Sequence, residues 1–279
     1  MQLSIIIPTI NRQVELEALL SSIENYVTNI TFEVIIIDQN AVGFLDNLIN
    51  RFKEKINITH HLVSFRGLSK AKNYGIKVAK GEYLSFPDDD CMLFPDTYTN
   101  ALNILKTENI DMVFGRCIDS NGRDSVLNFK KETYKLNKKN MTGGFVEATG
   151  IINKSVFESG FYFDENMGAG CFHGAEEGYD WLYRILTETP IDAFYSTNII
   201  FYHPQVLLDK GSPQSIKRVF TYSCGKAYLY RKHKFYTKYF KRIILVAISI
   251  LVYVIISQKK AKYYLSELLG LLSGIIIEK

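Results

Sequence analysis

Four short apolar runs constrain the fold of this chain most strongly. They cover Leu3–Pro8, Glu33–Asp38, Ile58–Val63 and Glu82–Phe86. Their length and their many branched side chains are typical of strands buried on both faces. Between them, apolar residues recur at helical spacing. The pattern predicts helices after a cap at Asn11, over 43–55 and over 68–79.

Alternating strands and helices predict an α/β fold, with a mostly parallel central sheet that helices cover on both faces. Ligands of such sheets bind beyond the carboxyl ends of the strands. Three polar clusters fall at those ends: the Pro8–Arg12 turn, Asp38, and the triplet Asp88-Asp89-Asp90. We therefore expect one ligand site along a single edge of the sheet.

The second half of the chain is less regular. It predicts helices over 95–106 and 177–187, strands over 111–117 and within 143–153 and 191–202, and a mobile polar loop over 120–140. We expect a catalytic domain over 1–205, with a nucleotide-sugar half (1–118) and an acceptor half (119–205), and a separate tail over 206–279.

The triplet Asp88-Asp89-Asp90 suggests a metal site. Adjacent carboxylates repel each other, and a divalent cation relieves that repulsion. Magnesium keeps several waters and binds one or two carboxylates together with substrate phosphates. The alternative is a solvated acidic turn without a ligand.

The motifs at Ser4–Thr9, Glu33–Asp38, Gly67–Ile76 and Gly81–Asp90 resemble, in this order, those of the family 2 glycosyltransferases of GT-A fold. The resemblance covers about residues 3 to 205. It implies a fold of the GT-A type and transfer of a sugar from a nucleotide-diphosphate sugar.

The resemblance also assigns roles on the donor side. Pro8, Thr9 and Arg12 would lie against the nucleotide. Asp38 would hydrogen-bond the base, typically uracil, which favours a UDP-sugar.

Further roles fall on the third and fourth motifs. Lys72 and Asn73 match the family's A-R-N, with lysine in place of arginine, and would face the diphosphate; the alternative for Lys72 is a solvated helix lysine. Asp88 would face the ribose or sugar, Asp89 would belong to the same nucleotide-sugar site, and Asp90 would hold Mg2+ or Mn2+.

An acidic segment, Ala175–Arg184, matches the region where the family carries its catalytic base. Alignment on Asp180 and Arg184 makes Glu177 the base, whereas a shift of one residue restores Glu176 and Glu177 as an acidic pair. Asp180 and Arg184 could also form a simple helix ion pair. Helix-terminal acids without chemistry are the alternative for both glutamates.

His203 follows the last expected strand. Related enzymes often carry a histidine there that helps hold the metal or diphosphate, so His203 is a candidate metal ligand. A purely structural hydrogen-bonding histidine is the alternative.

The C-terminal tail combines positive charge with apolar runs. Residues 210–262 hold 13 of the 33 basic residues and none of the 29 acidic ones. The uncharged run 243–257 would be about 22 Å long as a helix, too short to span a bilayer. A second run, 263–277, is interrupted by Glu267 and two glycines. We expect membrane-surface contact through 210–279; packing on protein is the alternative.

The resemblance and the tail together predict a non-processive, inverting transferase that adds one sugar to a glycan or lipid-linked acceptor. Its expected context is lipopolysaccharide, capsule or exopolysaccharide synthesis at the cytoplasmic face of the membrane, without nucleic acid as a partner. The Q-x-x-R-W motif usual in processive members is absent, since 214–219 reads Q-S-I-K-R-V. A sugar-phosphate nucleotidyltransferase and a non-catalytic membrane or nucleic-acid binder are the alternatives.

Overall fold

The computed structural model describes residues 1–205 and 209–276 of the 279-residue chain. Its contacts divide the chain into two units, and each is described by itself. The first unit comprises Met1–Phe65, Ala71–Tyr162 and Trp181–Val206, and the second comprises Arg66–Lys70, Phe163–Asp180 and Leu207–Lys279. The expected domain boundary after residue 205 stays a prediction.

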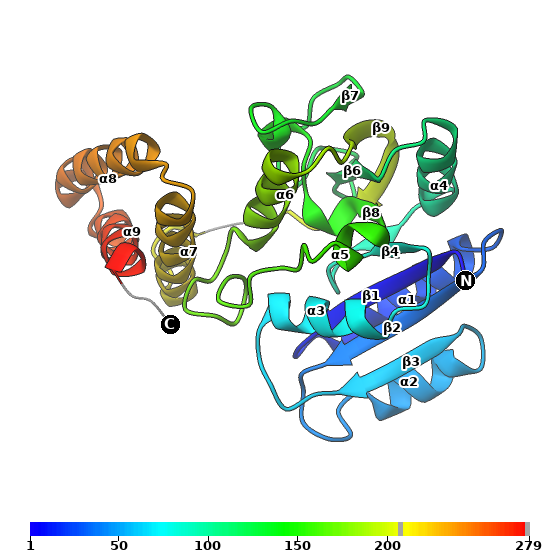
Figure 1. Ribbon diagram of the computed structural model, residues 1–279. Helices are drawn as coiled ribbons and strands as arrows, with labels where there is room; N and C mark the ends of the chain where they lie inside the picture. Colours follow the sequence, from blue (N-terminus) through cyan, green and yellow to red (C-terminus); the bar gives the residue numbers. More distant parts are fainter. Residues whose placement is uncertain (206–208, 277–279) are drawn as a thin grey trace. The chain divides into compact units, whose positions relative to one another are not determined.

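The described strands of the first unit form one mixed nine-stranded sheet (Figure 1). Strand order is β3-β2-β1-β4-β8-β6-β9-β5, with β7 beside β9. The pairs among β1 to β4 are parallel, and β8 runs antiparallel to both neighbours. The strands are β1 (Leu3–Thr9), β2 (Phe32–Asp38), β3 (Ile58–Leu62), β4 (Tyr83–Ser85), β5 (Met92–Leu93), β6 (Met112–Ile118), β7 (Tyr134–Lys135), β8 (Gly150–Asn153) and β9 (Ala193–Tyr202).

Helices cover both faces of the parallel part, as the alternating pattern predicts. Right-handed crossovers place the helices of β1-to-β2 and β2-to-β3 on one face and the helix of β3-to-β4 on the other. Figure 1 shows α1 and α3 on opposite sides of the sheet. The helices with residues in this unit are α1 (Gln13–Tyr26), α2 (Asp46–Lys53), α3 (Leu68–Val78), α4 (Thr97–Thr107), α5 (Ser155–Glu158), α6 (Glu177–Glu188) and the 3-10 turns η1 (Met141–Gly143) and η2 (Glu147–Thr149).

Some local expectations are wrong. Asn11 does not cap α1: it has a left-handed φ of 57°, and Arg12 occupies the N-cap position. The α2 helix begins at Asp46 rather than at residue 43. Two short strands, β5 and β7, were not expected, and β7 lies inside the segment expected to be a loop. Two-residue strands carry too little pattern to be found in a sequence.

A buried polar network holds the amino-terminal ends of the parallel strands together. The Ser4 hydroxyl on β1 donates to Glu33 on β2 (2.7 Å) and accepts from the backbone N–H of Gly81, just before β4 (2.8 Å). Glu33 also accepts from the backbone N–H of Lys80 (2.7 Å). Since both side chains are buried, each contact satisfies a group that water cannot reach.

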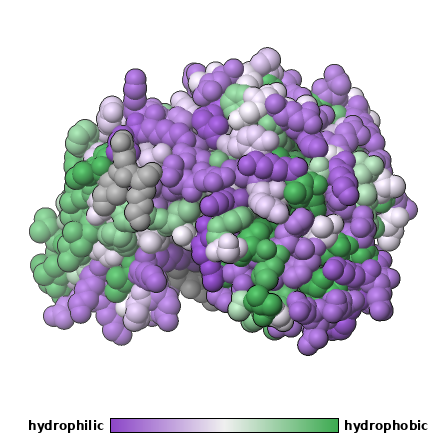
Figure 2. All heavy atoms as spheres, turned by 60° about the horizontal axis from the view of Figure 1, so that its bottom comes forward, coloured by the Kyte–Doolittle hydropathy of each residue, from purple (hydrophilic) through white to green (hydrophobic). Residues whose placement is uncertain are grey.

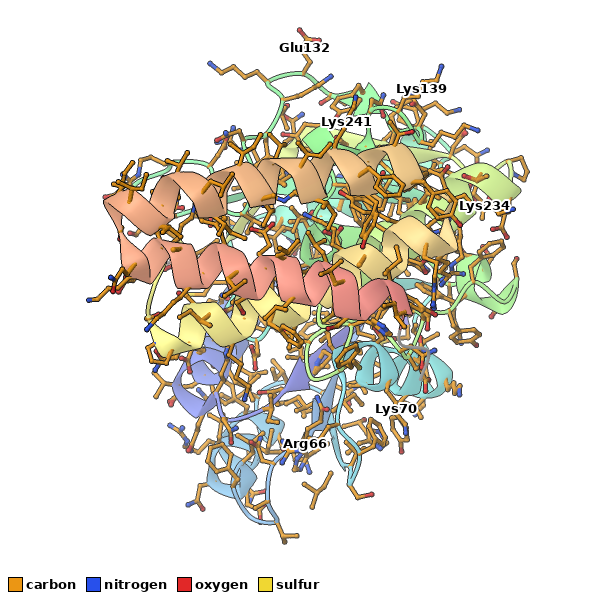
Figure 3. The ribbon with its side chains drawn as sticks, turned by 90° about the vertical axis from the view of Figure 1, so that its left-hand side faces the viewer. Arg66, Lys70, Glu132, Lys139, Lys234 and Lys241 are labelled. Carbon is orange, nitrogen blue, oxygen red and sulfur yellow. The ribbon has the colours of Figure 1, made fainter. Side chains whose placement is uncertain are left out.

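The second unit contains the helices α7 (Pro213–Lys232), α8 (Tyr236–Ile256) and α9 (Gln258–Ile276). Figure 3 looks onto α8 and α9, which lie side by side. Gly270 and Gly274 do not interrupt α9. A Cβ there would lie 2.4 Å from the carbonyl oxygen of Phe220 and 2.3 Å from that of Cys224. Both glycines therefore let α9 approach the backbone of α7 closely.

The apolar run of the tail was expected to be too short to span a membrane, and the structure corrects its length. The helix extends over 21 residues, because its first turns include Tyr236, Tyr239 and Phe240. Among the described residues, α8 alone is long and apolar enough to cross a membrane, judged by length and composition.

Replacing Ser4 with alanine tests the polar network. The buried N–H of Gly81 loses its acceptor and Glu33 loses a donor, so Ser4→Ala should lower the free energy of unfolding by about 1–3 kcal/mol. Ser21→Ala, on the half-buried side of α1, should change it by less than about 0.5 kcal/mol. Urea denaturation measures both, and equal values would contradict the role given to Ser4.

Candidate functional site

Strand register brings three of the predicted polar positions together. Thr9 on β1 pairs with Asp38 on β2. On the other side of β1, Ile5 pairs with Ser85, so Thr9 and Asp89 each lie four residues beyond one matched pair. The Thr9 hydroxyl donates to Asp89 at 2.8 Å. The predicted convergence at the carboxyl edge of the sheet is therefore confirmed.

Asp89 is the inward-facing member of the triplet. One carboxylate oxygen accepts from Thr9, and the other accepts from Arg12 at 2.9 Å. Burial raises the pKa of Asp89 to about 6, although Arg12 and the Thr9 hydrogen bond act in the opposite direction. Through these two contacts, Asp89 holds the Pro8–Arg12 turn against the triplet.

Asp88, Asp90 and His203 form the candidate metal centre. Met92 pairs with Tyr202 across the antiparallel β5–β9 contact, which sets the residues just before β5 beside His203. His203 Nε2 lies 3.6 Å from Asp90 Oδ1 and 4.0 Å from Asp88 Oδ2. One ligand atom from each of the three residues fits within a 4.8 Å group.

The chemistry of this group suits a divalent cation. Asp90 Oδ1 is buried and has no hydrogen-bond partner. His203 Nδ1 lies 2.7 Å from the carbonyl oxygen of Pro204; a carbonyl only accepts, so Nδ1 carries a proton. In the neutral ring Nε2 then offers its lone pair toward the aspartates. The two carboxylates supply the oxygen ligands that Mg2+ and Mn2+ prefer, and the imidazole would add one nitrogen ligand.

Asp38 lies at the same edge but has protein partners. Asn40 donates to it from both its backbone N–H (2.8 Å) and its side-chain amide (2.7 Å). His60 Nε2 lies 2.9 Å from the other oxygen. The role of Asp38 toward a nucleobase stays a prediction.

Lys72 is buried rather than solvated, so the alternative of a solvated helix lysine is wrong. Its side chain is 2% exposed and pairs with Glu147 in η2. Burial raises the pKa of Glu147 against the opposing effect of Lys72, and the charge of Asp88 raises it further. The pair therefore lies within electrostatic range of the triplet. Asn73, the next residue on α3, is also buried.

Glu176 and Glu177, the two candidate bases, belong to different local environments. Glu177 begins α6, and its side chain lies against Gly168, whose φ is +100°. A Cβ at Gly168 would come within 3.2 Å of Glu177 Cγ. Glu176 has a left-handed φ of 72° and pairs with Lys226 at 3.4 Å. Neither the role of Glu177 nor that of Glu176 follows from these contacts, and both stay predictions.

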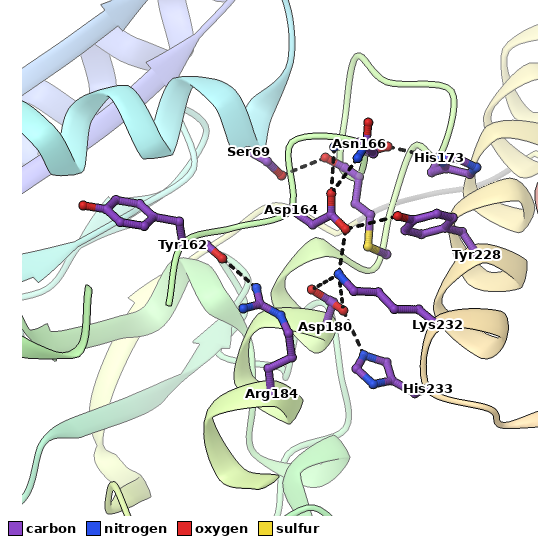
Figure 4. A network of polar contacts seen from close by, with 11 residues as sticks. Ser69, Tyr162, Asp164, Asn166, His173, Asp180, Arg184, Tyr228, Lys232 and His233 are labelled. Carbon is purple, nitrogen blue, oxygen red and sulfur yellow. Dashed lines mark hydrogen bonds and ion pairs between the residues drawn. The ribbon is translucent and has the colours of Figure 1, made fainter. Parts of the chain in front are cut away.

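A polar network fastens the glutamate-bearing segment to α7 (Figure 4). Lys232 donates to Asp164 at 2.6 Å and to Asp180 at 3.0 Å, and His233 Nε2 lies 2.8 Å from Asp180. Burial alone would raise the pKa of Asp164, but hydrogen bonds from Lys232 and from the N–H of Asn166 lower it. Asp180 is fully buried, so its ionic partners are needed for the fold of this unit.

Three features of the site were not predicted from the sequence. Asp88, predicted to face the ribose or sugar, also belongs to the candidate metal group, which was not predicted for it. Its role toward the sugar stays a prediction. Glu147 pairs with Lys72, and His60 lies within hydrogen-bond distance of Asp38. Neither Glu147 nor His60 was predicted to belong to the site. His60 offered a weak signal, because it lies two residues before Leu62, which pairs with Asp38. Nothing in the sequence around Glu147 points to Lys72, 75 residues away.

A family model described as Glycosyl transferase family 2 matches residues 4–164, more than half of the chain. The chain therefore belongs to glycosyl transferase family 2. Its sheet and flanking helices form the GT-A fold that the resemblance implied.

Curated relatives match over shorter stretches. A poly(ribitol-phosphate) beta-glucosyltransferase of Bacillus spizizenii is 28% identical over 137 residues, 48% of this chain and 22% of the relative. The GalNAc(5)-diNAcBac-PP-undecaprenol beta-1,3-glucosyltransferase of Campylobacter jejuni is 32% identical over 120 residues, 42% of this chain and 38% of the relative. The match thus spans between a fifth and two fifths of these relatives.

Solved structures share the fold over nearly the whole chain. Staphylococcus aureus TarS 1-349 in complex with UDP-GlcNAc superposes with a TM-score of 0.64 at 16% identity, covering 98% of this chain and 91% of that one. The mannosyltransferase PcManGT of Pyrobaculum calidifontis, in complex with GDP-Man and Mn2+, gives a TM-score of 0.55 at 15% identity, covering 98% and 72%.

Replacing Asp90 with asparagine tests the candidate metal centre. Loss of one anionic ligand should weaken Mn2+ binding by roughly tenfold or more, since affinity follows ligand charge. Asp46→Asn, at the exposed start of α2, removes the same charge elsewhere and should leave affinity unchanged. Electron paramagnetic resonance of free Mn2+ during a titration measures both. Equal affinities in the two variants would remove Asp90 from the site.

Proposed function

We propose that this chain transfers a single sugar from a nucleotide-diphosphate sugar, with UDP as the favoured nucleotide, to an acceptor hydroxyl. The observation that carries the proposal is the candidate metal group Asp88–Asp90–His203 at the carboxyl edge of the sheet, in a chain of family 2. The names of the relatives support an acceptor in bacterial surface-polymer synthesis, either a glycan or a lipid-linked one.

On the donor side, each residue has a separate task in the proposal. Thr9 and Arg12 shape the turn against which the nucleotide lies, together with Pro8. Asp38, held in place by Asn40 and His60, offers an acceptor to the base. A divalent cation held by Asp88, Asp90 and His203 would neutralise charge on the leaving diphosphate. Lys72 adds a buried positive charge near the triplet, with Asn73 beside it.

On the acceptor side, Glu177 is the proposed base. A carboxylate at a helix N-terminus is stabilised in its ionised form, as a group that accepts the proton of a hydroxyl must be. Attack by the deprotonated hydroxyl from the face opposite the diphosphate gives the inverted product.

Replacing Glu177 with glutamine tests the reaction and the base together. The variant should bind a UDP-sugar with Mn2+ as wild type does, in a thermal-shift screen of nucleotide sugars. Transfer of labelled sugar to membranes of the native cells should fall roughly 10²–10⁴-fold, the contribution of a general base.

Glu176→Gln is the matched control and should retain most of the transfer rate. Full activity in Glu177→Gln with a large loss in Glu176→Gln would move the base by one residue. A wild-type protein that responds to no nucleotide sugar would overturn the transferase proposal itself.

We further propose that α8 contacts the cytoplasmic face of the membrane. Its apolar residues are largely exposed, with Leu251 at 71% and Ile255 at 88%. Figure 2 shows the hydrophobic surface gathering at the left edge, where Figure 1 places α8. Basic residues flank the apolar stretch at Lys241-Arg242 and at Lys259-Lys260, as in segments that attach to anionic membrane surfaces.

Charge placed on the exposed face of α8 tests the membrane contact. The double variant Leu251→Asp/Ile255→Asp should sediment with phosphatidylglycerol vesicles at least about tenfold less than wild type, because a carboxylate is costly in an apolar layer. Val42→Asp/Val126→Asp, at exposed positions of the first unit, should bind vesicles like wild type. If the wild-type protein does not bind vesicles and self-associates instead, the exposed face of α8 forms a protein contact rather than a membrane contact.

The alternatives gain no support. Membership of a glycosyltransferase family argues against the nucleotidyltransferase and against a non-catalytic binder. No nucleic acid is needed to account for the basic tail, since a membrane surface accounts for both its charge and its exposed apolar face.

A further inference from the structure

A pocket of about 210 Å³ lies within the second unit. Its polar lining comes from all three helices of the tail and from the segment before α6. It is smaller than the roughly 300–1,000 Å³ of pockets that enclose a drug-sized molecule, so its size suits a small head group. The charged and aromatic residues that matter for its chemistry are Glu176, Arg218, Tyr222, Lys226, Arg242 and Glu267.

Most of the charges in this pocket neutralise each other. Lys226 pairs with Glu176 at 3.4 Å. Arg242 Nε donates to the buried Glu267 at 2.6 Å. Both carboxylates of the pocket therefore have a basic partner within the unit.

Arg218 carries the remaining charge. No carboxylate among residues 1–205 and 209–276 lies within ion-pair distance of its guanidinium, which lies 4.8 Å from the ring centre of Tyr222. Stacking on an aromatic ring orients the planar group and leaves its N–H donors at the edge available. A guanidinium fork presented in this way matches the oxygen pairs of a phosphate. Lys226, which lines the same pocket and also pairs with Glu176, is a second cation there.

The position of the pocket along the chain suggests where the phosphate comes from. Arg242 lines the pocket and directly precedes the uncharged stretch of α8 that begins at Ile243. Basic residues at the end of a membrane-contacting helix lie at the level of the lipid head groups. A ligand held by the pocket would thus sit where the phosphate of a lipid is found.

We propose that the Arg218 pocket binds the terminal phosphate of a lipid, with the Arg218 guanidinium as its main contact and Lys226 as a second donor. The phosphate chemistry follows from the pocket alone. The lipid as its carrier rests on the membrane contact proposed above for α8. Neither part depends on the proposed sugar transfer.

Vesicles that differ only in the anionic group test the pocket. Wild type should bind phosphatidylcholine vesicles containing phosphatidic acid more tightly than vesicles of equal zeta potential in which oleate supplies the charge. Arg218→Met should lose this preference, with binding to the phosphatidic acid vesicles weakened roughly tenfold. Lys217→Met removes the same charge from the neighbouring exposed residue of α7, outside the pocket lining, and should keep the preference.

Soluble glycerol phosphate separates the two parts of the proposal. One result would be that glycerol phosphate protects wild type, but not Arg218→Met, against thermal unfolding while wild type shows no preference among the vesicles. That result would support the phosphate site and contradict the proposal that a lipid carries the phosphate. Equal loss in Arg218→Met and Lys217→Met, or no preference in wild type together with no glycerol phosphate effect, would overturn the pocket. The unfolding temperature of each variant without ligand checks that the fold is intact.

Discussion

The parallel pairing of β1 with β2 and β4 is the constraint on which the candidate site depends. The register of these strands places Thr9 opposite Asp38 on β2 and within hydrogen-bond distance of Asp89, which follows β4. At the opposite end of the same strands, Ser4, Glu33 and the N–H of Gly81 fix that register with buried hydrogen bonds. A slip of one residue would turn every side chain of a strand to the wrong face. Contacts at the amino-terminal ends of the strands therefore help to set the carboxyl edge, where the candidate site lies.

Much of the first unit could be predicted because its signals are local. Runs of branched apolar residues specify buried strands, and their polar ends specify one edge of a parallel sheet. The pairing of β5 with β9 could not be predicted, because it joins a two-residue strand to one more than 100 residues away. That pairing brings His203 to Asp90, so the family resemblance, rather than a local pattern, pointed to His203.

Sequence patterns were less informative for the second unit. The charge and apolar content of the tail were visible, but the length of α8 was not, since tyrosines and a phenylalanine among lysines extend it beyond the uncharged run. The glycines of α9 look like helix breakers on propensity alone. They serve close packing instead, because a side chain at either position would strike the backbone of α7. Tertiary contact thus overrides a weak local preference.

The three aspartates that suggested a metal have different neighbours although they are chemically identical. Asp88 and Asp90 lie beside His203, while both oxygens of Asp89 are engaged by Thr9 and Arg12. Arg12 also pairs with the second oxygen of Asp90. The triplet therefore meets two requirements: it supplies the candidate metal ligands, and it anchors the Pro8–Arg12 turn. A relative that conserved only the outer two aspartates would keep the ligands for an ion and the partner of Arg12 at Asp90, and would lose the contact that Thr9 makes with Asp89.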